Sequence, residues 1–420
     1  MHVARENRQQ ALIALVQILG LAVWFSATAV GPSLQHEWNI SPAAGVWLTA
    51  SVQLGFVAGA VTSTSLSLAD RFRPQLLLGA CAAGAALTTA LLAAFADGLA
   101  PAIVLRFLTG VFLAGVYPVG MKLMASWSAP ALRGKAFGIL IGALTLGSAA
   151  PHLISSMGNL PWRNVMAAAA ALAAAAALTA VLAIRTGPYV EKSITRPNPR
   201  YALTMFKELR PRLANIGYFG HMWELYALWT WLPMYLLASE AGGPDRALGT
   251  GLSVFIAMGL GGVVGAVFGG WAADRWGRPK SAAIALAVSG TCCFLSPLMF
   301  WVYEIPMLIF LSIWGAAVIA DSGVFSTSLS ENVDSRYVGT ALTTQTAIGF
   351  LLTVVTIQFV PLFAAIVGWQ YAFVLLLPGP LIGVLAMHSL EKIESPTRKA
   401  SHDPHPTRSR TNRSPVTHDH

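Results

Sequence analysis

Apolar residues recur along the chain in blocks of about 20, separated by short polar segments. A helix of that length spans the hydrocarbon core of a bilayer, because each residue adds about 1.5 Å along the axis. The pattern therefore predicts an all-α membrane protein. Its twelve expected transmembrane helices are residues 11–30, 44–67, 75–96, 100–125, 135–157, 162–184, 214–237, 248–272, 280–301, 305–329, 339–366 and 369–389.

The composition agrees with a chain whose main solvent is lipid. Of the 420 residues, 55% are hydrophobic and 11% are charged, against about 25% charged in an ordinary soluble domain. Mean hydropathy is +0.62. The three cysteines, Cys81, Cys292 and Cys293, all fall within expected helices, so we interpret them as packing residues.

The formal net charge of +9 does not indicate a nucleic-acid partner. The basic residues lie between the apolar blocks and are not gathered on one domain with stacking aromatic residues. If both termini are cytoplasmic, all of the 27 Lys and Arg residues except Arg106, Arg163 and Arg246 lie on that side. The positive-inside rule therefore predicts cytoplasmic N- and C-termini, in a bacterial inner membrane.

Two landmarks in the first half of the chain return in the second. Asp70-Arg71-Phe72-Arg73-Pro74 resembles Asp274-Arg275-Trp276-Gly277-Arg278-Pro279, which starts 204 positions later (274 − 70). Trp162 opens the sixth expected helix as Trp369 opens the twelfth, 207 positions later (369 − 162). This spacing indicates a duplicated unit of six helices.

The duplication divides the chain into four parts. A six-helix bundle at 1–190 is followed by a cytoplasmic linker at 191–213, a second bundle at 214–390 and a tail at 391–420. In the linker, 201–213 has apolar residues at helical spacing, which fits an interfacial amphipathic helix or a plain tether. The tail is rich in Pro, Ser, Thr, Arg and His and is expected to be disordered.

Gly270-x-x-x-Asp274-Arg275-x-Gly277-Arg278 is similar to the signature loop of the major facilitator superfamily, which the sequence resembles over all twelve helices. The resemblance implies two six-helix bundles related by a pseudo-twofold axis, with a substrate site between them at mid-membrane. It also implies a gating latch. An acid at a helix end can meet a neighbouring helix N-terminus and loop arginines. The latch residues are Asp70, Arg71, Asp274, Arg275 and Arg278.

Arg106, followed by Gly110 and Gly115, resembles a second motif of that superfamily, whose arginine faces the central cavity and takes part in proton coupling or anion binding. The alternative is an arginine that snorkels to the outer surface. Small residues also recur every four positions in the eighth helix, which favours close packing against another helix of the same chain, with dimerisation through this seam as the alternative. The resemblance to twelve-helix porters implies a monomer. The glycines of that seam are Gly261, Gly265 and Gly269.

Arg106, Glu224 and Asp321 fall within expected helices 4, 7 and 10, which line the cavity in the superfamily. Charges inside a bilayer are costly, so these residues are candidates for the substrate and proton pathway. His152 and His221 could titrate near neutral pH or stay neutral in helix contacts. His221-x-x-Glu224 lacks further ligands for a metal, and we expect no metal and no cofactor.

These residues predict a secondary active transporter, with proton-coupled uptake of a small organic or inorganic anion by alternating access. Glu224 or Asp321 would carry the proton, and Arg106 would hold the anion. Alternatives are a proton-antiport efflux pump, or a membrane sensor or assembly protein that kept the fold without transport. We find no nucleotide-binding loop or nucleophile with a base, so an enzyme is not expected. The expected partners are a small solute, protons and membrane lipid, with no nucleic acid.

Overall fold

The computed structural model describes residues 2–129, 132–158, 160–189, 201, 205–239, 248–334 and 337–401, without the side chains of 2–3 and 395–401. Throughout these residues the regular structure is helical, which confirms the all-α class. The first half contains α1 (His2–Leu21), α2 (Ser26–Ala29), α3 (Gly31–Glu37), α4 (Pro42–Gly45), α5 (Trp47–Ser65), α6 (Leu68–Arg71), α7 (Pro74–Phe95), α8 (Leu99–Leu113), α9 (Tyr117–Ser126), α10 (Arg133–Ser156) and α11 (Trp162–Ala183).

The second half repeats this all-helical organisation, with one π-helical and one 3-10 segment. It contains α13 (Leu209–Ala238), α14 (Thr250–Val254), the π-helix η3 (Phe255–Leu260), α15 (Gly261–Trp276), α16 (Arg278–Met299), α17 (Glu304–Ala320), α18 (Ser322–Asn332), α19 (Val338–Val367), the 3-10 helix η5 (Trp369–Leu376) and α20 (Pro378–Ser401).

Among the described residues, ten helical segments are long and apolar enough to span a membrane. They correspond to ten of the twelve expected helices. The other two expected helices fall on α1 with α2 and on α13, which are not among the ten. Both are rich in polar, charged or aromatic residues: α1 carries Arg5, Glu6 and Arg8, and α13 carries His221 and Glu224.

Several helices predicted to be continuous are interrupted, and three of these breaks bear on the site described below. The first breaks at residues 22–25, the fourth at 114–116 and the tenth at Asp321. Pro118 explains the second break, because proline lacks the N–H that would bond four residues back. The other two breaks coincide with buried charged side chains, which are described below.

Two predicted boundaries differ from those of the structure. Helix α13 begins at Leu209, and residues 205–208 are turns and a bend. Of the two alternatives for 201–213, an amphipathic helix or a plain tether, a continuous helix does not extend through 205–208. Residues 190–200 and 202–204 lie outside the described part of the chain. At the other end, α20 continues to Ser401, into the tail expected to be disordered.

The extension of α20 has a physical reason. Met387 and Leu390 are buried against the bundle, and the Asn332 amide donates to the Glu394 carboxylate at 3.2 Å. These contacts continue past the last apolar block, which is where the predicted helix ended. The rest of the tail, 402–420, lies outside the described residues.

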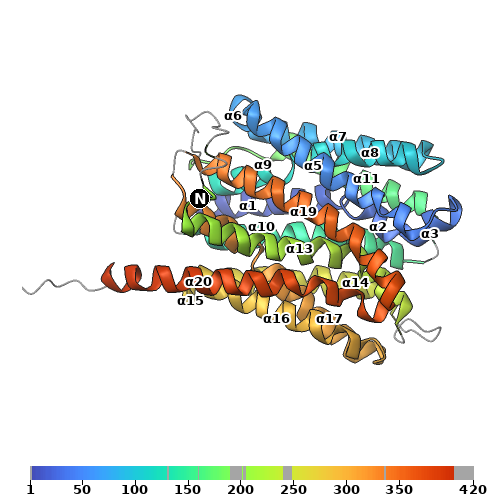
Figure 1. The fold of residues 1–420 in the computed structure, drawn as a ribbon. Helices are drawn as coiled ribbons and strands as arrows, with labels where there is room; N and C mark the ends of the chain where they lie inside the picture. The colour runs from blue at the N-terminus through green and yellow to red at the C-terminus, as the bar shows by residue number, and fades with distance from the viewer. Residues whose placement is uncertain are drawn as a thin grey trace, which may run out of the picture.

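Most of the long helices run roughly along one direction, with the first half of the chain beside the second (Figure 1). The two halves meet where α5 packs on α19 and where α10 packs on α15. The N-terminus and the far end of α20 lie at the same end of the bundle, which we call the terminal face. Helices α3 and α14 lie at the other end, the opposite face.

The glycines predicted to pack helices closely do so within this chain. A Cβ at Gly265 would lie 2.0 Å from the Ala316 carbonyl oxygen, and one at Gly269 would lie 1.9 Å from that of Ala320. Helix α15 therefore approaches α17 at a distance that no larger residue permits. The other three glycines are also close to a neighbouring helix. A Cβ would meet the Ser312 carbonyl at Gly261, the Val52 carbonyl at Gly110 and the Cys81 sulfur at Gly115.

Candidate functional site

A cavity of about 90 Å³ lies between the two halves. The first half contributes the break after α1, with α9 and α10, and the second half contributes α13, α17, α18 and α19. Its walls are Trp24, Phe25, Tyr117, Ile141, Leu144, Thr145, Ser148, Tyr218, His221, Met222, Leu225, Tyr226, Trp229, Ile319, Ser322, Ser326, Thr346 and Phe350. This central cavity is therefore mostly apolar and aromatic, with hydroxyl groups and one histidine.

Six aromatic side chains from both halves form what we call the aromatic cluster. The Phe25 and Trp229 rings are stacked, with centroids 4.9 Å apart and planes 9° from parallel. Trp229 lies eight residues beyond His221 in α13, toward the opposite face, so the stack closes the cavity on that side. The cluster consists of Trp24, Phe25, Phe56, Tyr226, Trp229 and Phe350.

His221 is the one residue in this cavity wall that can carry a positive charge. Its Nδ1 lies 2.9 Å from Asp321 Oδ1, and both side chains are buried. The pair attracts when the imidazole is protonated, although the approach does not have hydrogen-bond geometry. His221 Nε2 lies 3.4 Å from the Ser322 hydroxyl. The structure thus brings two of the predicted pathway residues together at the cavity.

Two isoleucines separate the central cavity from a second one. Ile141 and Ile319 line both the central cavity and a cavity of about 290 Å³ at the terminal face, which we call the vestibule. A Cβ at Gly323 would lie 2.6 Å from Ile141 Cδ1, so this isoleucine of the first half is seated on a glycine of the second. We call Ile141, Ile319 and Gly323 the partition.

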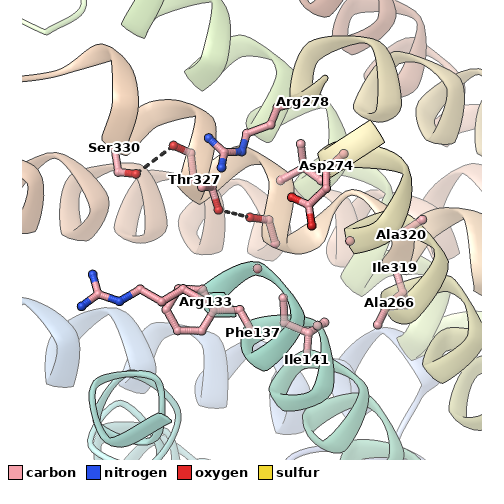
Figure 2. Close-up of a pocket in the computed structure, with 16 residues that line it drawn as sticks. Arg133, Phe137, Ile141, Ala266, Asp274, Arg278, Ile319, Ala320, Thr327 and Ser330 are labelled. Atoms are coloured by element: carbon pink, nitrogen blue, oxygen red, sulfur yellow. Dashed lines mark hydrogen bonds between the residues drawn. The ribbon is translucent and has the colours of Figure 1, made fainter. Parts of the chain in front are cut away.

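The vestibule contains part of the predicted latch (Figure 2). Asp274, at the end of α15, lies beside the first turn of α10: a Cβ at Gly134 would be 3.4 Å from either carboxylate oxygen. Negative charge is favoured at a helix N-terminus. The Arg133 side chain extends away from Asp274 in Figure 2. Asp274 therefore reaches across from one half to the other.

The other latch residues have different surroundings. Arg278 forms an ion pair with Glu331 of α18, inside the second half. Asp70 Oδ1 lies 2.5 Å from Lys122 Nζ, so its partner is a lysine of the same half that the sequence did not single out. Arg71 and Arg275 are exposed at the terminal face. Among the contacts described here for the latch residues, that of Asp274 with α10 crosses between halves.

Arg106 is fully buried, so the interpretation that it snorkels to the surface is wrong. It also lies outside the wall of the central cavity. Its guanidinium donates to the carbonyls of Val23 at 2.8 Å and Leu48 at 3.1 Å, and to that of Trp24. A further donor meets the Ser26 hydroxyl at 3.3 Å. Arg106 thus satisfies carbonyls that the break in the first helix leaves without helical partners.

Glu224 is fully buried but faces α16 and α17, inside the second half. Its carboxylate accepts from Trp314 Nε1 at 2.6 Å, from the Ser289 hydroxyl at 2.9 Å and from the Cys293 thiol at 3.4 Å. His152 is also buried and lies outside the cavity wall. The roles predicted for Arg106, Glu224 and His152 in the pathway stay predictions.

The sequence did not single out the partition, Tyr117 or the aromatic residue Phe25. An isoleucine within an apolar helix carries no signal of its own. Gly323, two residues after the intramembrane acid Asp321, was the available hint. No group of three or more His, Cys, Asp or Glu side chains within the described ranges is placed to hold a metal ion.

Comparison with known proteins gives consistent matches. The sequence profile described as Major Facilitator Superfamily matches residues 13–357 and 215–417. A probable sulfoacetate transporter of Cupriavidus necator is 26% identical over 364 residues, covering 79% of this chain and 83% of the relative. A gallate transporter of Pseudomonas putida is 26% identical over 322 residues, with coverages of 68% and 70%. A gentisate transporter of Corynebacterium glutamicum is 26% identical over 386 residues, with coverages of 87% and 83%.

A solved structure has the same fold. The human organic anion transporter MFSD10 superposes with a TM-score of 0.69 and 15% sequence identity, covering 91% of this chain and 99% of that chain. At this identity the likeness shows the fold alone. It agrees with the two-bundle architecture that the sequence motifs implied.

Proposed function

Because the chain belongs to the Major Facilitator Superfamily, we propose that it is a secondary transporter for a small organic anion, with planar aromatic carboxylates as the substrate class. The observation that carries this proposal is the central cavity, where aromatic rings surround a single histidine. Aromatic walls suit a planar ring, and a protonated imidazole suits a carboxylate. The relatives named for gallate and gentisate transport are consistent with such a substrate.

The size of the cavity indicates a closed conformation. Its volume of about 90 Å³ is below the roughly 150 Å³ of an apolar cavity known to accept benzene. A substituted benzoate therefore needs the walls to separate. The aromatic cluster closes one end and the partition closes the other, so alternating access would open one of these contacts at a time.

The proposed orientation places the terminal face in the cytoplasm of a bacterium, with the protein in the inner membrane. The supporting observation is the excess of Lys and Arg on that side. Both halves of the cavity come from one chain, which supports a monomer as the working unit. Cysteine variants at Tyr303, exposed at the opposite face, and at His388, exposed near the terminal face, test the orientation with an impermeant thiol reagent on intact cells. Only the first should react.

Proton-coupled uptake remains part of the proposal, with Asp321 or Glu224 as the acid that carries the proton. The geometry favours Asp321, because it contacts a residue of the cavity wall. Glu224 is instead enclosed by three donors from its own half. A proton on the His221–Asp321 pair would travel with a monoanionic substrate without net charge.

The test is exchange of labelled gentisate across the membrane of proteoliposomes that contain the purified protein. Unlabelled gentisate and benzoate should compete, and benzamide, which has the same ring without the charge, should not. An inward-acidic or inward-alkaline pH gradient then gives the direction of coupling. Competition by benzamide as strong as that by benzoate would contradict an anion site, and absence of exchange with every aromatic carboxylate would contradict the substrate class.

A further inference from the structure

We propose that His221 is the residue that binds the substrate carboxylate, and that it does so by exchanging Asp321 for the substrate, which releases the partition. The inference rests on the proposed function, since it requires an anion in the central cavity. Asp321 is then a positioning residue: it holds the imidazole in the empty protein and is freed when the cavity fills. The same contact would serve both recognition and gating.

The charges around the central cavity favour His221 as the anion site. No Lys or Arg side chain is among the residues that line the central cavity in the described structure. Arg106, the other intramembrane cation, directs its guanidinium at three backbone carbonyls and one hydroxyl. A carboxylate that enters the cavity therefore has His221 as its cationic partner, and a charge-assisted contact is among the strongest available there.

Asp321 competes with a substrate carboxylate for His221. His221 Nδ1 is already 2.9 Å from Asp321 Oδ1, and Asp321 is 1% exposed. A buried carboxylate is costly when its partner is removed. When the imidazole turns to the substrate, Asp321 takes up a proton from water and becomes neutral. No covalent bond changes, and one proton accompanies one carboxylate.

Other ionisable groups near this pair do not supply a competing cation. Asp321 is at the junction of α17 and α18, and Glu224 lies on α13 three residues after His221. Three tyrosines of α9 and α13 line the cavity. The carboxylate of Glu224 adds negative charge near Asp321 and is fixed by its own three donors. The tyrosines are Tyr117, Tyr218 and Tyr226.

The His221–Asp321 pair lies next to the partition. Asp321 is the residue at which the tenth helix breaks, since it ends α17 and precedes α18. Ile319 lies two residues before Asp321 and Gly323 two residues after it. The Ile141 side chain packs against Gly323. A change at Asp321 therefore acts directly on both residues that the second half contributes to the partition.

The gating part can be tested without any substrate. A cysteine replaces Ser148, which lies in α10 on the cavity side of the partition, in a variant lacking Cys81, Cys292 and Cys293. A thiol reagent is applied to vesicles whose terminal face is outward, with orientation checked through His388→Cys. In Asp321→Asn the amide cannot pair with an imidazolium, so labelling at Ser148→Cys should rise about tenfold, the size of a modest population shift.

Two further variants keep this test decisive. His221→Gln breaks the same contact from the other side and should raise the labelling similarly, even if Asp321→Asn fails to fold. Thr327→Cys, on the vestibule side, is the control and should react at the same rate in every background. Unchanged labelling of Ser148→Cys in a folded Asp321→Asn or His221→Gln protein would overturn the gating role.

The recognition part uses gentisate as the probe. Binding to purified protein, followed by tryptophan fluorescence, should weaken between about 10-fold and 100-fold in His221→Gln, as for loss of a charged hydrogen bond. His221→Lys keeps a cation and should recover part of the affinity, while His388→Gln, the surface control, should bind like the wild type. Normal binding by His221→Gln would overturn the assignment. Failure of the wild type to bind any aromatic carboxylate would instead refute the proposed function and leave the labelling result standing.

Discussion

The breaks in the first and tenth helices each lie at a buried side-chain contact, but the two contacts differ in their chemistry. At residues 22–25, carbonyls without helical partners accept from Arg106, which stays charged at any physiological pH. At Asp321, the break is held by contact with a histidine, whose charge depends on pH and on what else binds it. The first break is thus chemically fixed, whereas a proton or an anion can alter the second.

Each break also carries a contact to the other half of the protein. Trp24 and Phe25, at the first break, pack on Tyr226 and the Phe25 ring stacks on Trp229. The tenth-helix break places Gly323 under Ile141 of the first half. The two ends of the central cavity are therefore closed by segments whose backbone leaves the regular helix.

The largest effect expected from this comparison is on stability, at Arg106. Replacing it by Met removes the guanidinium donor from the buried carbonyls of Val23, Trp24 and Leu48. A buried carbonyl left unsatisfied should cost about 1–3 kcal/mol. Lys supplies a charge but not the planar fork, so Arg106→Lys should recover only part of this. The measurement is denaturant or thermal unfolding in detergent, with the exposed Arg275→Met as the control, expected within about 0.5 kcal/mol of wild type. A folded Arg106→Met protein of normal stability would show that the break does not depend on the arginine.

The second prediction separates the two intramembrane acids. Asp321→Asn should abolish accumulation of gentisate driven by a pH gradient and retain exchange at equal concentrations, because the pair then cannot release a proton. Glu224→Gln should keep gradient-driven accumulation, since its carboxylate only anchors α16 and α17. Accumulation that survives in Asp321→Asn and disappears in Glu224→Gln would move the proton to Glu224.

The contrast between the two acids also shows what the sequence could predict. An acid within an apolar block signals function because of its cost, and that reasoning correctly drew attention to Glu224 and Asp321. It could not tell them apart, because their partners are distant in the chain: Trp314 is 90 residues from Glu224, and His221 is 100 residues from Asp321. Only the packed structure shows that one acid faces its own bundle and the other contacts a cavity residue.

The helices themselves were predicted well because the length of an apolar block is set by the bilayer. The breaks within the first, fourth and tenth helices were not predicted. Residues 22–25 are as apolar as their neighbours, and their stabilising contacts go through backbone carbonyls to Arg106, which no pattern of side chains reveals. The break at 114–116 was missed as well, although the N–H that Pro118 lacks can be read from the sequence.

The third prediction concerns the partition. Ile141→Val removes one methylene from the contact with Gly323, and a loss of about 0.5–1.5 kcal/mol is typical for this change in a packed site. The closed state should be destabilised, so labelling of Ser148→Cys from the terminal face should rise about 2-fold to 10-fold. Leu144→Val, in the same helix and in the wall of the central cavity alone, is the matched control. An equal rise with both would mean that the packing of α10 in general, and not the partition, sets access.

The smallest expected effect is at the latch, where Asp274 and Asp70 are the two copies of the repeated motif. Asp274 lies against the first turn of α10, across the boundary between halves. An exposed carboxylate at a helix N-terminus contributes only modestly to the stability of such a contact. Asp274→Asn should therefore change the exchange rate only about 2-fold to 5-fold. Gentisate affinity should not change, because the central cavity is left intact.

Asp70 pairs with Lys122 inside the first half. Asp70→Asn therefore breaks no contact between halves and should leave the rate near that of the wild type. Since the screening of exposed charges grows with salt, the difference between the two variants should shrink in 1 M NaCl. Equal slowing by both variants would show that the two copies act alike despite their different partners, and loss of gentisate binding in Asp274→Asn would place that residue in the substrate site.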